Sequence, residues 1–327
     1  MKLHHTATAL FLFLPLLLSC NNKDELSGDV VSGYSPLLLS AEAPSPFSRS
    51  YIPQGMYDNF KVFAVSETGG TQTVVMNGYD VKFQNDEWSY VTDTQRLMYW
   101  NSNADRYLFT AGAPSDAVTA ISATSVTLHL ENNLSGSVMA CEPLAIANGS
   151  PNFGKTVNLR FAYAHCMVCV AFLNTSSADV NVSDIMLTPN ASISSEANMT
   201  YAYDWSMTTV TTTQQLTTTA TSKASLLYDD VTVPANTTDA ILSSTRYYCV
   251  PDASNTKDWT VTLNRNGEQK TATFENSKTW ESGKNYIYIF SLTEKSPKLV
   301  KVLTKDSFFD CNDIIPGGEF SDTDMTE

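Results

Sequence analysis

Residues 157–172 read VNLRFAYAHCMVCVAF, a stretch without glycine or proline. Every second residue from Val157 to Ala171 is apolar apart from His165, and residues two apart share one face of a β-strand. The other face starts with polar residues and ends with apolar ones. A strand of this kind is covered on one face at its start and on both faces at its end, as in the middle of a β-sandwich. We therefore predict a single core strand over this stretch.

The composition of the whole chain also favours strands. Charged residues make up 17% of the 327 positions, while Thr, Ser, Tyr, Val and Asn are abundant. These are residues of strands and polar loops rather than helices. Asn77-Gly78 and Asn266-Gly267 separate alternating runs, a pattern typical of β-hairpins. We predict a fold that consists mainly of β structure.

The length of the chain is enough for two domains, each with its own core. Residues 207–222 are rich in Thr and nearly uncharged, which favours an exposed hairpin or a linker at a domain boundary. We predict an N-terminal domain over residues 50–200 and a C-terminal domain over 201–305. An acidic tail covers residues 306–327 and is expected to be loose.

The N-terminus predicts export. Residues 1–19 contain a lysine and an apolar run that is shorter than the about 20 residues needed to span a bilayer, which is typical of a signal peptide. The run ends in LLSC, which resembles a bacterial lipobox, so Cys20 would carry the lipid and become the mature N-terminus. In the alternative, an ordinary signal peptide is cut nearby and Cys20 is incidental. The polar residues after Cys20 fit either a surface-export signal or a solvated linker.

The charge of the chain argues against nucleic acid as a partner. The formal net charge is −14, and no cluster of Lys or Arg offsets it locally. Residues 149–156, GSPNFGKT, match the letters of a phosphate-binding loop. That loop requires a following helix, whereas the residues after Thr156 alternate as a strand, so we expect an ordinary loop.

The sequence offers no catalytic residues, metal ligands or cofactor site. His129 and His165 are the two histidines left after removal of the signal, and neither has a partner at metal-ligand spacing. Asp229 and Asp230 are neighbours in the sequence, so their side chains are expected to point apart as solvated charges. We predict that the protein is not an enzyme.

The cysteines leave several pairings open. Besides Cys20 there are five, which cannot all pair: Cys141, Cys166, Cys169, Cys249 and Cys311. Cys166 and Cys169 are predicted to lie on opposite faces of one strand and so cannot bridge each other. One bridge among the distant cysteines is compatible with an oxidising compartment, and small buried hydrophobic residues are the alternative.

Three separated motifs resemble the fimbrillin family, the pilus subunits of Gram-negative anaerobes. One is the run from Tyr163 through His165 to Val170, although Cys169 stands where the family usually has Lys. The others are Trp100 followed by the spacing Tyr107-x-Phe109-x-Ala111-x-x-Pro114, and the run WESGKNYIY, which contains Trp280, Gly283 and Tyr286. With the lipobox, these motifs extend over most of the chain.

The resemblance implies an all-β fold of two tandem transthyretin-like, Greek-key β-sandwich domains. It also implies export as a lipoprotein to the outer membrane and the fimbrium, with other fimbrial subunits as partners and a ligand on a host or bacterial surface. In polymerising members a trypsin-like protease cuts after an arginine near the N-terminus. Arg49 and Ser50 are at the corresponding kind of position, which would remove a strand predicted at residues 34–41. The alternative for Arg49 is an ordinary loop residue.

The function expected from these features is that of a structural or adhesive pilus subunit, assembled by strand complementation. A monomeric glycan-binding surface lipoprotein is the first alternative, since the five tryptophans would stack on sugars if they were exposed. In β-sandwiches, tryptophans more often fill the core. A lipoprotein hydrolase is the second alternative.

Overall fold

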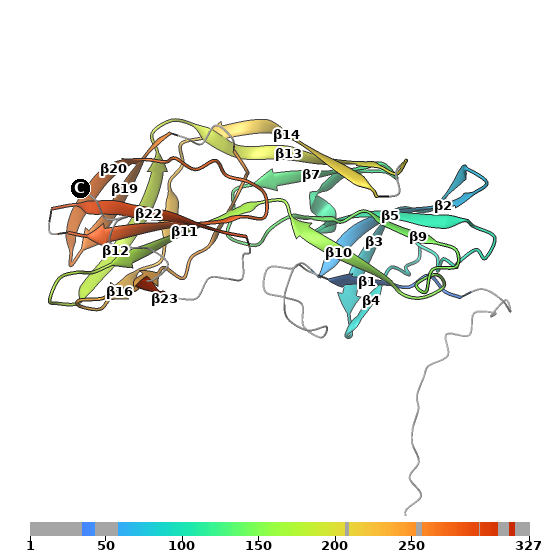
Figure 1. The fold of residues 1–327 in the computed structure, drawn as a ribbon, viewed down its shortest axis with the longest axis horizontal. Coiled ribbons are helices and arrows are strands. Elements are labelled where there is room, and N and C mark those ends of the chain that lie inside the picture. Colours follow the sequence, from blue (N-terminus) through green and yellow to red (C-terminus); the bar gives the residue numbers. More distant parts are fainter. Residues whose placement is uncertain are drawn as a thin grey trace, which may run out of the picture. The chain divides into compact units, whose positions relative to one another are not determined.

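The computed structural model describes residues 35–42, 58–206, 209–252, 257–293, 295–306 and 314–317. They form strands almost throughout, joined by turns and one short 3-10 helix, η1 (Ser115–Ala117) (Figure 1). Within this part of the chain no helix is long and apolar enough to cross a membrane. The predicted all-β fold is confirmed, with sheets packed face to face as in β-sandwiches.

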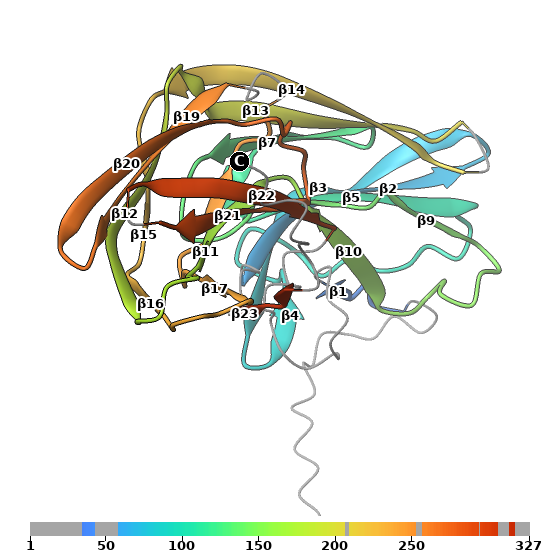
Figure 2. The same cartoon turned by 60° about the vertical axis from the view of Figure 1, so that its left-hand side comes forward.

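Two sheets are built mainly from the first half of the chain (Figure 2). The larger has the order β1 (Leu39–Glu42), β10 (Val157–Tyr163), β8 (Met139–Cys141), β5 (Arg106–Ala113), β2 (Asn59–Thr68), β3 (Thr71–Gln84) and β4 (Glu87–Ser89), with β9 (Leu144–Ala147) beside β5. The smaller has the order β14 (Thr211–Ser222), β13 (Ile193–Asp204), β7 (Ser125–Glu131) and β6 (Val118–Ile121). One hydrophobic cluster joins Val65 and Leu108 of the larger sheet to Leu128 and Met199 of the smaller.

Two further sheets enclose a second core. One has the order β22 (Pro297–Lys305), β21 (Asn285–Leu292), β11 (Cys166–Leu173), β17 (Ala240–Leu242) and β23 (Ile314–Ile315), with β18 (Tyr247–Cys249) on β11. The other has the order β15 (Leu226–Tyr228), β12 (Val180–Pro189), β19 (Asp258–Arg265) and β20 (Glu268–Glu275), with β16 (Val231–Val233) on β12. Phe172, Trp259 and Tyr288 are buried in this core.

The stretch 157–172 forms two strands rather than the predicted one. β10 and β11 belong to different sheets, and the chain leaves strand geometry at Ala164 and His165. The break is fixed by hydrogen bonds at both residues: the Ala164 N–H donates to the Val138 carbonyl at 2.8 Å, and the His165 ring bonds the backbone of other segments. The predicted change in burial is confirmed, because β10 alternates between buried and exposed residues while β11 is buried throughout.

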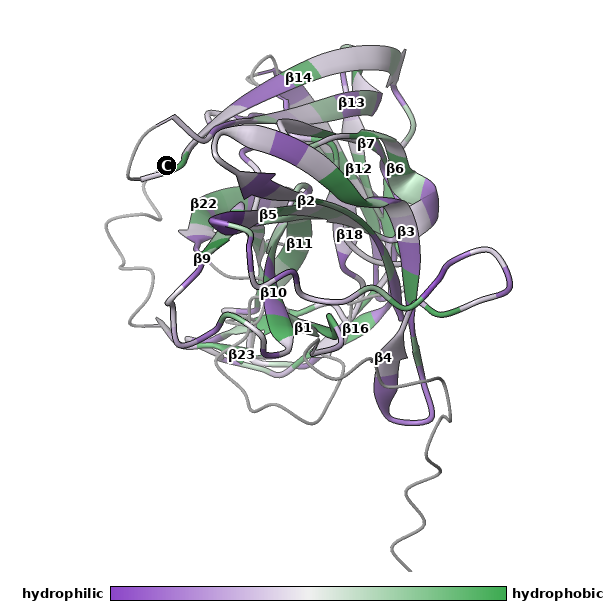
Figure 3. Cartoon of the chain, turned by 90° about the vertical axis from the view of Figure 1, so that its right-hand side faces the viewer, coloured by the Kyte–Doolittle hydropathy of each residue, from purple (hydrophilic) through white to green (hydrophobic). Residues whose placement is uncertain are grey.

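Strand pairing crosses the predicted domain boundary near residue 200. β11 and β12 precede that position but pair with strands that follow residue 225, whereas β13 and β14 pair back towards β7. Strand pairing alone does not delimit folding units, so the domain boundary at residue 200 stays a prediction. Of the two alternatives for the Thr-rich run, the structure shows an exposed strand paired with β13, pale to hydrophilic in Figure 3.

Candidate functional site

The first described segment, residues 35–42, adds a strand to the edge of the larger sheet. Its strand β1 runs parallel to β10, with Leu39 opposite Val157. The Val157 N–H donates to the Leu38 carbonyl at 2.8 Å, and the Ser40 hydroxyl donates to the Val157 carbonyl at 3.4 Å. The strand predicted at residues 34–41 is thus present only in part: β1 begins at Leu39 and ends at Glu42, and Pro36 forms an isolated bridge to Tyr99.

The same segment is hydrogen-bonded on its other side to residues 98–100. The Leu37 N–H donates to the Met98 carbonyl at 2.8 Å, and the Trp100 N–H donates to the Ser35 carbonyl at 2.9 Å. The buried Tyr90 hydroxyl donates to the Leu37 carbonyl at 2.6 Å and accepts the Met98 N–H at 3.1 Å. The segment therefore has backbone partners on both sides. We call the space that it fills between β10 and residues 98–100 the groove.

The side chains of this segment alternate between the groove and the solvent. Leu37 and Leu39 are 0% and 4% exposed and belong to the hydrophobic core of the larger sheet, whereas Leu38 between them is 46% exposed. The same core contains Leu159 and Phe161 of β10. Figure 3 shows hydrophobic residues on β1 and on the adjoining part of β10. We call residues 35–42 the plug segment, because its leucines fill the apolar groove.

Charge contributes little to holding the plug segment. The Glu42 carboxylate lies 3.5 Å from the Arg160 guanidinium, but the two side chains are 36% and 72% exposed. Ion pairs so open to water are worth at most about 1 kcal/mol. Backbone hydrogen bonds and buried leucines hold the segment instead.

The family motif that begins at Trp100 borders the groove. Trp100, Tyr107 and Phe109 are all buried, and the Trp100 ring centroid lies 4.7 Å from that of Tyr107 and 6.4 Å from that of Phe109. The Tyr107 hydroxyl accepts the Asn101 N–H at 2.6 Å. This cluster fixes residues 100 and 101, so it positions the backbone that bonds Ser35 of the plug segment.

The motif around His165 and the WESGKNYIY motif meet at the chain crossing between β10 and β11. The His165 ring accepts the Val138 N–H on Nδ1 at 3.0 Å, and its Nε2 lies 3.1 Å from the Glu131 carbonyl, to which it donates. Burial lowers the pKa of His165 to about 4, since no carboxylate compensates for the lost water. The Gly283 N–H donates to the His165 carbonyl at 2.8 Å. His165 is a neutral structural residue in this arrangement.

The loop of the third motif has its own internal bonds. Gly283 has a φ of +75°, a left-handed conformation that favours glycine. The Tyr286 hydroxyl donates to the Thr279 carbonyl at 2.7 Å, and the Trp280 indole donates to the Tyr288 hydroxyl at 3.0 Å. These contacts give Trp280, Gly283 and Tyr286 a role in shaping the loop.

Three predicted positions lie outside the described residues: the lipidation residue Cys20 and the processing residues Arg49 and Ser50. The signal peptide 1–19 and most of the acidic tail lie outside them as well. Tyr90 and Met98 were not singled out from the sequence, and Val157 was predicted only as part of a core strand. The apolar run at residues 37–39 marked the segment opposite them only as a strand, because three leucines in a row do not show which side chain is buried.

The features that suggested other chemistry are ordinary parts of the fold. Residues 149–156 form turns that lead directly into β10, so the helix N-terminus that a phosphate-binding loop requires is not present there. None of the five tryptophans is exposed: Trp100, Trp205, Trp259 and Trp280 are buried, and Trp88 is half-buried against Phe60 and Phe83. The exposed tryptophans that the glycan-binding alternative requires are therefore not observed.

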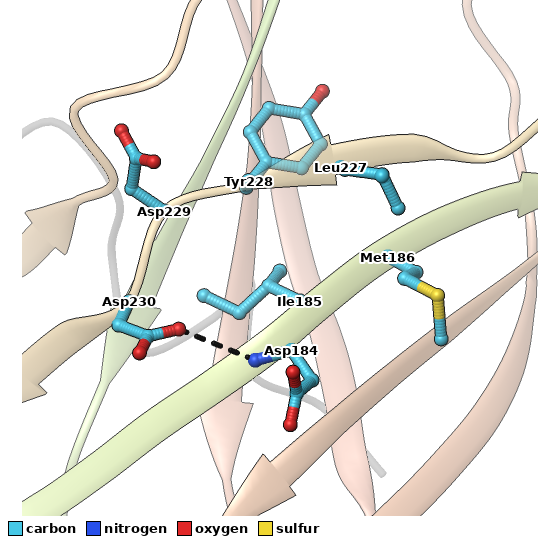
Figure 4. Close-up of a pocket in the computed structure, with 7 residues that line it drawn as sticks. All are labelled: Asp184, Ile185, Met186, Leu227, Tyr228, Asp229 and Asp230. Atoms are coloured by element: carbon cyan, nitrogen blue, oxygen red, sulfur yellow. Dashed lines mark hydrogen bonds between the residues drawn. The ribbon is translucent and has the colours of Figure 1, made fainter.

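A surface hollow of about 560 Å³ lies on the five-stranded sheet (Figure 4). Asp184, Asp229 and Asp230 line it beside apolar residues, and all three are exposed. The Asp230 carboxylate accepts the Asp184 N–H, while the Ser244 hydroxyl lowers the pKa of Asp229. Within the described part of the chain no group of three His, Cys, Asp or Glu side chains is placed to hold a metal ion.

Comparison with known proteins decides the family. The fimbrillin-like family model matches residues 54–306. The chain belongs to the fimbrillin-like family. No match was found among curated proteins.

Solved structures agree with the fold of this fimbrillin-like chain. A candidate cell adhesion protein from Bacteroides uniformis superposes with a TM-score of 0.53 at 12% identity, covering 84% of this chain and 98% of that one. A candidate cell adhesion protein from Bacteroides ovatus gives a TM-score of 0.53 at 10% identity, covering 85% and 99%. At such identities the likeness shows a shared fold, and family membership indicates a fimbrial protein of the cell surface.

Proposed function

We propose that the chain is a structural or adhesive pilus subunit, lipidated at Cys20 and carried to the surface of the outer membrane. Its plug segment is removed by proteolysis after Arg49, and a strand of the next subunit takes its place. The observation that supports this most is the plug segment itself, a separate strand seated in an apolar groove by Leu37 and Leu39. Residues 43–57, which contain Arg49, join it to the next described residues.

Removal of the plug segment would leave backbone groups without hydrogen-bond partners and would open an apolar part of the core. The Val157 N–H and the Met98 carbonyl would lose their partners, and the sites of two buried leucines would open. An unpaired sheet edge beside an apolar groove is a template for a strand from another chain. Because each subunit would fill the groove of the next, the contact is head-to-tail and builds a fibre rather than a closed ring.

Two C-terminal segments are candidates for the donor strand: residues 299–303 and the acidic tail. Residues 299–303 belong to β22, which pairs with β21 through eight of its nine residues. β23 has two residues, pairs with β17 only through Ile314 and Ile315, and leaves Ile314 50% exposed. The weaker attachment supports the tail, from residue 314 onwards, as the donor.

The test is to block cleavage. In cells that carry Arg49→Ala we expect full-length monomer on the surface and no high-mass ladder in unboiled gels. Arg96→Ala is the matched control, since it removes an arginine of a described loop and leaves the cleavage position intact. N-terminal sequencing of the wild-type protein should start at Ser50. Wild-type cells that never form a ladder, or a ladder in the Arg49→Ala cells, would contradict the proposal.

A further inference from the structure

Two cysteines that are distant in the sequence lie directly opposite each other in the second core. In the antiparallel pair of β11 and β18, Cys166 is the register partner of Cys249. Directly opposite residues have Cα atoms about 4.5–5.5 Å apart, which is inside the range of about 4.4–6.8 Å found in disulfides. Side chains of such partners point to the same face of the sheet.

The side chains of this pair are also in the same environment. Cys166 and Cys249 are both 0% exposed and belong to the same hydrophobic cluster, and the Cys166 Sγ lies 3.4 Å from the Cys249 carbonyl oxygen. The other described cysteines are placed differently: Cys169 faces the opposite side of β11, and Cys141 lies on β8 of the larger sheet. Among the described cysteines, only Cys166 and Cys249 are register partners.

We propose that Cys166 and Cys249, which are thiols in this structure, form a disulfide when the chain folds outside the cytoplasm; the export step rests on the function proposed above. Two S–H bonds break and one S–S bond forms, with loss of two protons and two electrons. The electrons pass to an extracytoplasmic disulfide-exchange oxidant, whose own disulfide becomes a dithiol.

Oxidation has to occur during folding rather than after it. Burial raises the pKa of both thiols well above the usual range, and the thiolate is the form that attacks a disulfide. Once the core has closed, both sulfurs are also shielded from an external oxidant. The folded protein should therefore keep whichever redox state it acquired while folding.

The bridge would reinforce the crossing between the two groups of sheets. It joins residues 83 positions apart, directly after His165, where the chain passes from β10 to β11. β18 is also tied to the first half of the chain, since Tyr248 and Asn133 exchange two backbone hydrogen bonds of 2.9 Å. The disulfide lies within one sheet, where it would keep β18 on β11, and β18 carries the two backbone hydrogen bonds to Asn133.

The experiment maps thiols in the protein recovered from the cell surface. The protein is denatured with an alkylating agent and without reductant, then digested with trypsin. Peptide 247–257 contains Cys249 alone, whereas peptide 161–223 contains Cys166 and Cys169, so the Cys169→Ala variant is analysed alongside. We expect the two peptides to be linked, with neither Cys166 nor Cys249 alkylated. Alkylation of both residues, or a link to another cysteine, would overturn the proposal.

Controls separate this inference from the proposed function. Cys166→Ala should release Cys249 to alkylation, while Cys141→Ala should leave the link intact. A ladder of subunits with both thiols alkylated would refute the disulfide alone. Linked peptides in cells that form no ladder would refute the pilus assignment alone. If the chain is found in the cytoplasm, purified protein refolded in a glutathione redox buffer tests the pair directly, and the absence of the link refutes it.

Discussion

Two edge strands of the molecule, β1 and β22, are held in opposite ways. β22 is antiparallel to β21, pairs with it through eight of its nine residues, and follows it after a short connection. β1 has four residues, runs parallel to β10, and is separated from β2 by residues 43–58. An antiparallel hairpin strand cannot leave without opening its own turn, whereas a parallel strand on a long connection can be cut free. The topology thus marks β1 as the separable edge.

The two strands also differ in what they bury. The plug segment places Leu37 and Leu39 in the core at 0% and 4% exposure, although it is short. In β22, Leu303 is buried at 9% exposure, but most of the central residues are half-buried. Loss of the plug segment would therefore uncover the more deeply buried apolar sites, which supports the proposal that a donor strand binds in its place.

The largest expected effect comes from Leu37→Ala. In the uncleaved chain it should lower the free energy of unfolding by about 2–5 kcal/mol, because it leaves a cavity in a closed core. After removal of residues 1–49 the same variant should unfold like the wild type, since the altered side chain is gone. Urea denaturation of both forms gives the two values.

Leu38→Ala is the matched control for Leu37→Ala, because its side chain is largely exposed and should change stability by less than about 0.5 kcal/mol. Leu303→Ala on β22 should destabilise the cleaved and uncleaved forms alike. An equal loss for Leu37→Ala before and after cleavage would show that the plug segment is not the part removed.

An effect of up to about 3 kcal/mol is expected from pH at the crossing between the two regions. Folding lowers the pKa of His165 from 6.5 to about 4, so the unfolded chain binds the extra proton first as the pH falls. The contribution of His165 is complete above about pH 6.5 and is lost between there and about pH 4.

His165→Gln should flatten this dependence, although it also lowers stability at pH 7 by removing a ring that bonds two backbone groups. The measurement is the free energy of unfolding at a series of pH values for both proteins. Identical slopes between pH 6.5 and 4.5 would show that His165 is not the group that titrates.

The smallest effect is expected from Glu42→Gln, which removes the exposed ion pair between the plug segment and β10. The loss should stay below about 1 kcal/mol and should shrink further at high salt. Thermal unfolding at low and high salt tests this. A larger, salt-dependent loss would mean that charge, rather than the leucines and the backbone, holds the segment.

Local patterns predicted much of the fold. Asn266-Gly267 connects the antiparallel strands β19 and β20, as predicted. The hairpin predicted at Asn77-Gly78 is wrong, because β3 runs through both residues and they lie at a bulge in its pairing with β2. The turn between β2 and β3 is at Gly69-Gly70 instead. The aromatic motif at residues 100–109 predicted a structural cluster without showing that it borders a groove. Burial and turns depend on residues close together in the sequence, which is why these features were accessible.

The limit of such reasoning is clearest in residues 157–172. The sequence by itself determined that this stretch forms strands and that its second half is covered on both faces. Only the tertiary structure decided that it divides at His165, that β11 pairs with β21, and that Cys166 meets Cys249. The physical reason is that a period of two specifies which side chains share a face but not which distant strand completes the hydrogen bonds. That choice depends on contacts between residues about a hundred positions apart in the sequence. Such contacts place β11 beside β21 and the plug segment beside β10.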